Sequence, residues 1–159
     1  MITNDRRQYE DDILRRIRVY KKSVEQQFAF LKNTDKLDDL FAKSIKIDKA
    51  TCYLIPLCLV HKADDALISK LKTLHRENHI AYPKRLPVSA EGIINWIAEL
   101  MAARDKIIFL ILDRYGRPVG HIGLLNQATD ICRCKVIDIA WNKNEHYTET
   151  ISLCMKALT

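Results

Sequence analysis

The segment Lys106–Asn126, KIIFLILDRYGRPVGHIGLLN, carries the clearest structural pattern in this chain of 159 residues. Residues 106–112 and 119–126 are rich in apolar and β-branched side chains, and the polar residues between them include Gly116 and Pro118. Two apolar runs joined by a short segment of this kind are typical of an antiparallel hairpin. We therefore predict a β-hairpin here and work outward from it.

The residues before the hairpin predict one strand and two helices. Residues 51–60 (TCYLIPLCLV) are nearly all apolar, which is typical of a strand buried on both faces. Pro56 indicates a bulge or an edge position in that strand. Apolar residues at helical spacing follow Asp64 and Asp65, and again Ser89, so a helix is expected to begin at each place.

The residues after the hairpin predict another strand over 133–141 and a helix over 148–158. The order after residue 50 is therefore strand, helix, helix, strand, strand, strand, helix. This order indicates an α/β (α+β) domain at residues 50–159, preceded by a helical extension at residues 1–49.

The extension predicts helix over residues 6–46. Its apolar residues recur every three or four positions and form one stripe: Ile13, Leu14, Ile17, Tyr20, Val24, Phe28 and Leu31. After an interruption at 33–35, a second helix is expected to run through Ile45. The opposite face is basic. Either it is the solvated face of a packed helix, or residues 6–46 bind a partner protein or a second copy of the chain.

Composition and charge exclude several classes of protein. The chain is 48% apolar and 29% charged, which is a globular composition. The net charge of +6 is spread evenly, since residues 1–49 hold 12 Lys/Arg against 9 Asp/Glu and residues 50–159 hold 14 against 11. Nucleic-acid-binding proteins more often gather their basic residues on one face or tail, so the charge argues against such a partner.

No apolar run approaches the roughly 20 residues of a membrane-spanning helix, so no membrane association is expected. The polar N-terminus does not resemble a secretory signal. Five cysteines, an odd number without such a signal, predict reduced thiols and a cytoplasmic protein. Cys132 and Cys134 form a C-x-C pair without a second pair at zinc-ligand spacing, so we expect strand residues and no metal.

The predicted order of helices and strands resembles the first part of the fold of the GNAT superfamily of N-acetyltransferases. Several short sequence strings also resemble strings of that family. The string Arg117-Pro118-Val119-Gly120-His121-Ile122-Gly123-Leu124 is similar to the central hairpin of that family. Leu74-His75-Arg76-Glu77-Asn78 resembles the end of its first helix, and Ser89-Ala90-Glu91 with Asn95-Trp96-Ile97 resembles its second. The resemblance covers residues 51–158 and implies a mixed, largely antiparallel sheet flanked by helices. The later strands of the family have no counterpart, so the domain is expected to be C-terminally incomplete.

The resemblance also implies a site for acetyl-CoA as co-substrate. In this family the backbone of the fourth strand binds the pantetheine arm, and the following loop presents N–H groups to the pyrophosphate. The corresponding residues here are Ile139, Ala140, Trp141, Asn142, Lys143, Asn144 and Thr148. Families of this kind usually place glycines in that loop, whereas this chain has none after Gly123.

Acetyl transfer to an amine needs a group that removes a proton from the attacking nitrogen. Asp138, in the middle of the predicted strand, and His121 are the candidate catalytic residues. Each has a structural alternative: Asp138 on the solvent face of an alternating strand, and His121 as a strand-surface histidine. Tyr82 and Trp96 are candidates for an acceptor pocket, although the helical spacing of Trp96 favours a core position.

The resulting expectation is an N-acetyltransferase-like domain that moves an acetyl group to an amine of a small molecule, nucleotide sugar or protein. The alternative is a degenerate, catalytically inactive module that acts in protein association through its N-terminal helices.

Overall fold

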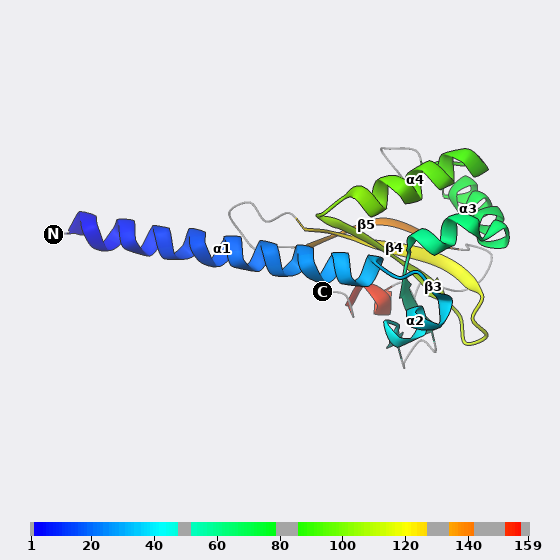
Figure 1. The fold of residues 1–159 in the computed structure, drawn as a ribbon, viewed down its shortest axis with the longest axis horizontal. Helices are drawn as coiled ribbons and strands as arrows, with labels where there is room; N and C mark the ends of the chain where they lie inside the picture. Colours follow the sequence, from blue (N-terminus) through cyan, green and yellow to red (C-terminus); the bar gives the residue numbers. More distant parts are fainter. Residues whose placement is uncertain (1, 48–51, 79–85, 127–133, 142–151, 157–159) are drawn as a thin grey trace.

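The computed structural model describes residues 2–47, 52–78, 86–126, 134–141 and 152–156 (Figure 1). Its elements, in chain order, are α1 (Ile2–Lys32), α2 (Leu37–Ala42), β1 (Ile45–Ile47), β2 (Cys52–Pro56), the 3-10 helix η2 (Leu59–Ala63), α3 (Asp65–Glu77), α4 (Ala90–Ala102), β3 (Lys106–Leu112), β4 (Pro118–Asn126) and β5 (Cys134–Trp141). Residues 152–156 form a helical turn.

The described strands form one sheet in the order β1-β2-β3-β4-β5, and every neighbouring pair is antiparallel. The mixed α/β class and the largely antiparallel sheet flanked by helices are therefore confirmed. The predicted hairpin is the β3–β4 pair, with Phe109 opposite Ile122 and Leu110 opposite His121. In the described part of the chain, β1 and β5 lie at the two edges.

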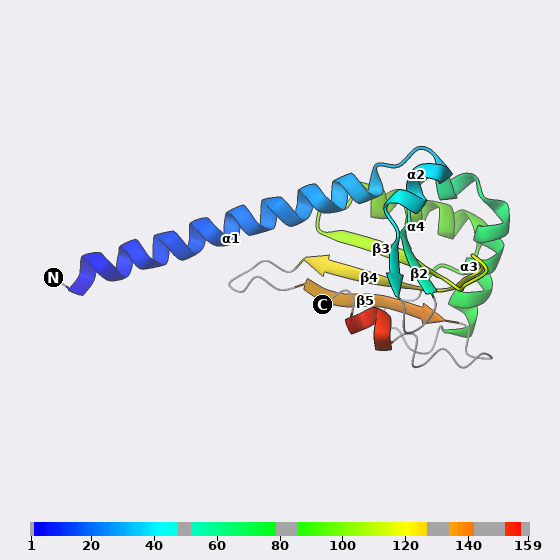
Figure 2. The same ribbon diagram turned by 90° about the horizontal axis from the view of Figure 1, so that it is seen from below.

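Helices cover both faces of the sheet (Figures 1 and 2). On one face, α3 and α4 pack on side chains such as Leu71, Ile97 and Leu110. On the other face, the C-terminal part of α1 packs through Val24 and Phe28 beside the helical turn 152–156. Because Ile107, Phe109 and Ile111 face one core and Ile108, Leu110 and Leu112 face the other, β3 is apolar at every position after Lys106.

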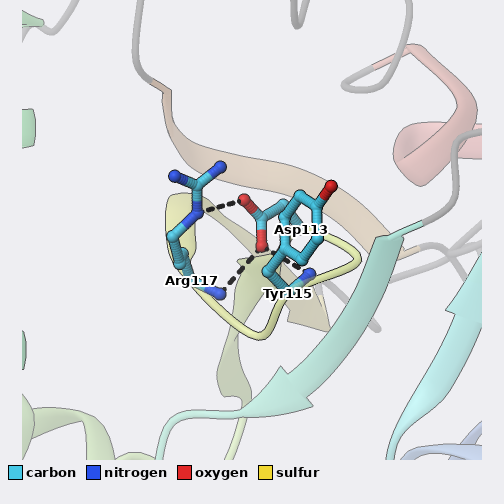
Figure 3. A network of polar contacts seen from close by, with 3 residues as sticks. All are labelled: Asp113, Tyr115 and Arg117. Carbon is cyan, nitrogen blue, oxygen red and sulfur yellow. Dashed lines mark hydrogen bonds and ion pairs between the residues drawn. The ribbon is translucent and has the colours of Figure 1, made fainter.

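The turn of the hairpin is held by one carboxylate (Figure 3). Asp113 Oδ1 accepts hydrogen bonds from the backbone N–H groups of Tyr115 and Arg117, both at 2.9 Å. Asp113 Oδ2 accepts one from Arg117 Nε at 2.7 Å. Gly116 has φ 77°, a left-handed conformation that favours glycine. Burial by itself raises the pKa of Asp113, but the hydrogen bonds from Arg117 and Tyr115 lower it below its ordinary value.

Lys32, the last residue of α1, is buried and joins this helix to the body of the domain. Its Nζ donates hydrogen bonds to the carbonyl oxygens of Leu100 at 2.9 Å and Lys106 at 3.0 Å, and also to that of Ala103. The ammonium therefore caps the C-terminal end of α4, where carbonyls have no partners within the helix. Burial lowers the pKa of Lys32, and Asp105 and Cys58 offset part of that effect.

Two predictions of local structure were wrong. Ile45–Ile47 form β1 rather than the end of a helix, because they pair with Leu54, Tyr53 and Cys52 of β2. The strand predicted over 51–60 ends at Pro56. The next residues turn into η2, where the Cys58 N–H donates to His61 Nδ1 at 2.8 Å. In both cases a contact with a nearby part of the chain, which the apolar pattern does not show, decides the local structure.

Candidate functional site

Strand β5 carries an irregularity opposite β4. His121 pairs with Ala140, and Gly123 pairs with Ile137, so the register shifts between these two pairs. The single residue Ile122 therefore lies opposite two residues of β5, Asp138 and Ile139. A two-for-one register of this kind is a β-bulge, which bends a strand and turns a peptide group out of the ladder.

The C-terminal end of β5 lies unusually close to β4. A Cβ atom on Gly120 would lie 2.4 Å from the carbonyl oxygen of Ala140 and 3.1 Å from the Cα of Trp141. Only glycine fits at that position, because both neighbours are backbone atoms. The lack of a side chain at Gly120 therefore lets the last residues of β5 lie close against the start of β4.

Asn78 connects the same end of β5 to α3. Its Nδ2 donates to the carbonyl oxygen of Leu74 at 2.7 Å and to that of Trp141 at 3.0 Å. The side chain is completely buried, and its Oδ1 has no hydrogen-bond partner among the residues that the structure describes. Asn78 and Gly120 thus hold the end of β5 from two sides.

Two buried histidines meet beside this end of the sheet. His75 on α3 and His121 on β4 are fully buried, with their Nε2 atoms 2.8 Å apart. His75 Nδ1 lies 2.6 Å from the carbonyl oxygen of Pro87. Since a carbonyl only accepts, His75 carries a proton on Nδ1. In the neutral pair its Nε2 then accepts from the Nε2–H of His121.

The half-buried Trp96 of α4 closes the cluster. Its ring centroid lies 5.1 Å from that of His75 in an edge-on arrangement and 5.4 Å from that of His121. The cluster therefore joins α3, α4 and β4, and Ala140 of β5 lies opposite His121. A chain of two imidazoles of this kind can hold and pass a proton at the edge of the bulge.

A separate cavity of about 490 Å³ lies between α3 and the hairpin turn. Its lining includes His61, Lys70, Leu110 and Arg117, and none of the residues predicted for the site. His61 is buried, and burial lowers its pKa.

Among the described residues there is no group of three or more His, Cys, Asp and Glu side chains that could hold a metal ion. None of the described helices is long and apolar enough to cross a membrane.

The fold is similar to that of a solved N-acetyltransferase. That structure is a GCN5-related N-acetyltransferase from Brucella melitensis, 17% identical in sequence, with a TM-score of 0.47. The match covers 67% of this chain and 50% of the other, so this chain spans about half the length of that protein. No family model matches the chain, and no curated protein matches it.

The structure describes only part of the predicted site. Asp138 lies in β5 at the bulge, but its side chain is outside the described part. Of the seven residues expected to bind the cofactor, three are described: Ala140 is buried, and Ile139 and Trp141 are half-buried in β5. The other four, and the acceptor candidate, lie outside the described residues: Asn142, Lys143, Asn144, Thr148 and Tyr82.

The structure corrects the interpretation of His121 as a strand-surface residue. Its side chain is fully buried, because the helix layer of α3 and α4 covers this face of β4. Trp96 packs against the core between these helices and the sheet, as its helical spacing favoured. His75 and Asn78 were not predicted as members of the site. Both lie in the string Leu74–Asn78, whose resemblance to the end of the first helix of the GNAT family is the one sequence signal that points to them.

Proposed function

We propose that this chain is an N-acetyltransferase-like domain that binds acetyl-CoA along β5 and transfers its acetyl group to an amine. The bulge at Asp138 and Ile139, directly beside the buried pair His75–His121, carries this proposal. This arrangement combines an irregular edge strand, to which the co-substrate would bind, with two histidines that can hold a proton.

The outer edge of β5 would supply the binding surface. In the described part of the chain, β5 pairs with β4 on one side and ends the sheet on the other. Edge strands present N–H and C=O groups that an extended molecule can meet as a further strand would. The amide groups of a pantetheine arm have this chemistry. The bulge gives one peptide group of the strand a different direction and so sets the depth at which the arm stops.

The loop after β5 would then receive the pyrophosphate. Lys143 supplies a positive charge there, and Asn142, Asn144 and Thr148 supply polar groups in place of the glycines common in the family. The anchoring of Trp141 by Asn78 and the close approach at Gly120 support a well-defined starting point for this loop.

In the reaction, the amine nitrogen forms a bond to the acetyl carbon while the bond from that carbon to sulfur breaks. The proton lost by the amine passes to a base and finally to the thiolate of CoA. We assign the base to Asp138, with His121 and His75 as the buried pair that holds or relays the proton. The acceptor belongs to the class of small molecules, nucleotide sugars and proteins with a free amine.

Cys52, Cys58 and Cys154 are free thiols, which supports a cytoplasmic setting.

The test is a thermal unfolding measurement with and without acetyl-CoA. A ligand at 100 times its Kd stabilises the native state by about 2.7 kcal/mol, which corresponds to about 5–10 °C in a domain of this size. We expect this shift in the wild type and a smaller one in Lys143→Glu. Lys36→Glu, with the same charge change on an exposed residue outside the site, is the matched control.

Loss of acetyl transfer in Asp138→Asn, with the thermal shift retained, would support its role as the base. Wild-type turnover in that variant would remove the assignment. If saturating acetyl-CoA does not change the melting temperature of the wild type, the proposal fails. The alternative, an inactive module that acts by protein association, would then stand.

A further inference from the structure

Helix α1 extends far beyond the body of the domain (Figures 1 and 2). Val24, Phe28 and Lys32 are buried against the body. Between residues 6 and 23, by contrast, every side chain is exposed except the half-buried Ile17. At 1.5 Å per residue these 18 residues form a rod of about 27 Å. We call residues 6–23 the projecting segment.

The projecting segment carries an apolar stripe along one side. Ile13, Ile17, Tyr20 and Val24 follow at intervals of four, three and four residues, which is the spacing of a two-helix coiled coil. Ile13 is 38% exposed and the neighbouring Leu14 is 48% exposed. The stripe continues into the part of α1 that packs on the sheet, where Val24 is covered.

A helix of this length gains little from local interactions alone. Most helical stability in proteins comes from packing an apolar face against another surface. Two exposed ion pairs, Arg6–Glu10 and Arg15–Asp12, support the segment, but pairs of this kind contribute only about 0.3–0.5 kcal/mol each. We therefore expect the stripe to pack against an apolar surface of similar length.

The charges of the projecting segment identify that partner. Its first half begins with Arg6 and Arg7 and then carries the acidic run Glu10, Asp11 and Asp12. Its second half carries five basic residues within 15–22: Arg15, Arg16, Arg18, Lys21 and Lys22. Two such helices side by side in the same direction would place acid beside acid and base beside base. In opposite directions, the acidic run of each helix meets the basic run of the other.

We propose that the chain forms a dimer in which the projecting segments of two copies pair as an antiparallel coiled coil. Ile13 of each copy packs beside Ile17 of the other, near the two-fold axis. A closed symmetric contact of this kind uses the same surface on both copies. The inference does not depend on acetyl-CoA binding.

The test is the molar mass of the full chain in solution by sedimentation equilibrium. We expect a dimer for the wild type and at least a tenfold weaker association for Ile13→Asn and Ile17→Asn. Val19→Asn is the matched control without a change of charge, because Val19 is 65% exposed but lies off the stripe, and it should remain dimeric. A monomeric wild type at 100 µM, or dimers unaffected by both stripe substitutions, would overturn the proposal.

The salt dependence of dimer formation tests whether the two helices pair in opposite directions. Attraction between the acidic and basic runs predicts weaker association in 500 mM than in 50 mM NaCl, because salt screens exposed charges. A parallel pair would show the opposite dependence and would contradict the antiparallel assignment. Urea unfolding of the body checks that the substitutions leave the domain folded. Asp11→Lys with Asp12→Lys should also weaken the dimer without touching the stripe.

Discussion

The Nε2 atoms of His75 and His121 lie 2.8 Å apart in a part of the core that water does not reach. This contact joins residues 46 positions apart in sequence and connects α3 to β4. A buried polar pair of this kind contributes to stability only while both partners are present, because either one alone leaves a buried nitrogen without its partner.

We expect His75→Leu and His121→Leu each to lower the free energy of unfolding by about 1–3 kcal/mol. The double variant should lose clearly less than the sum, since the second substitution removes a group that has already lost its partner. Urea unfolding of the four proteins measures this coupling. Strict additivity would show that the two rings stabilise the fold independently.

Gly120→Ala is expected to destabilise the domain, because its Cβ would lie 2.4 Å from the carbonyl oxygen of Ala140, a backbone atom. Overpacking typically costs about 1–3 kcal/mol. Gly116→Asn is the comparison, since there is open space around Gly116 and Asn tolerates a positive φ. A denaturation midpoint for Gly120→Ala equal to that of the wild type would show that β5 moves away from β4 without cost.

Lys32→Met should leave the carbonyl oxygens of Leu100, Ala103 and Lys106 without their donor and cost about 1–3 kcal/mol. Lys36→Met, at an exposed position, is the control and should stay close to the wild type. Because the folded pKa of Lys32 lies below 10.5, the unfolded chain binds more protons between the two values. Lys32 therefore makes stability rise with pH through that window, and the variant should lack this rise.

Asp113→Ala removes the acceptor for three donors of the hairpin turn and is expected to cost about 1–3 kcal/mol at pH 7. The folded pKa of Asp113 is lower than its ordinary value of 3.8. Above pH 3.8 the ionised carboxylate therefore stabilises the fold, and this stabilisation is lost as the pH falls through the lower pKa of the folded state. The difference between variant and wild type should shrink in acid. A difference that does not change between pH 7 and pH 2 would contradict this account.

Much of the local structure could be predicted because its causes are local. The β3–β4 hairpin follows from two apolar runs around Asp113–Pro118. Helix α4 begins where predicted, since Ser89 Oγ accepts a hydrogen bond from the Gly92 N–H at 3.0 Å. Apolar periodicity also identified the stripe along α1, because helical spacing depends on the sequence alone.

The sequence by itself determined the order of the helices and strands after residue 50, the burial of β2 on both faces and the apolar stripe of α1. Tertiary structure decided that Ile45–Ile47 form a strand, that His121 is buried against His75, and that Lys32 caps α4 from another helix. The strand at Ile45–Ile47 depends on pairing with Cys52–Leu54 nearby in the chain. The other two contacts depend on partners distant in the chain, and residue spacing does not state which distant backbone or side chain will lie within hydrogen-bond distance.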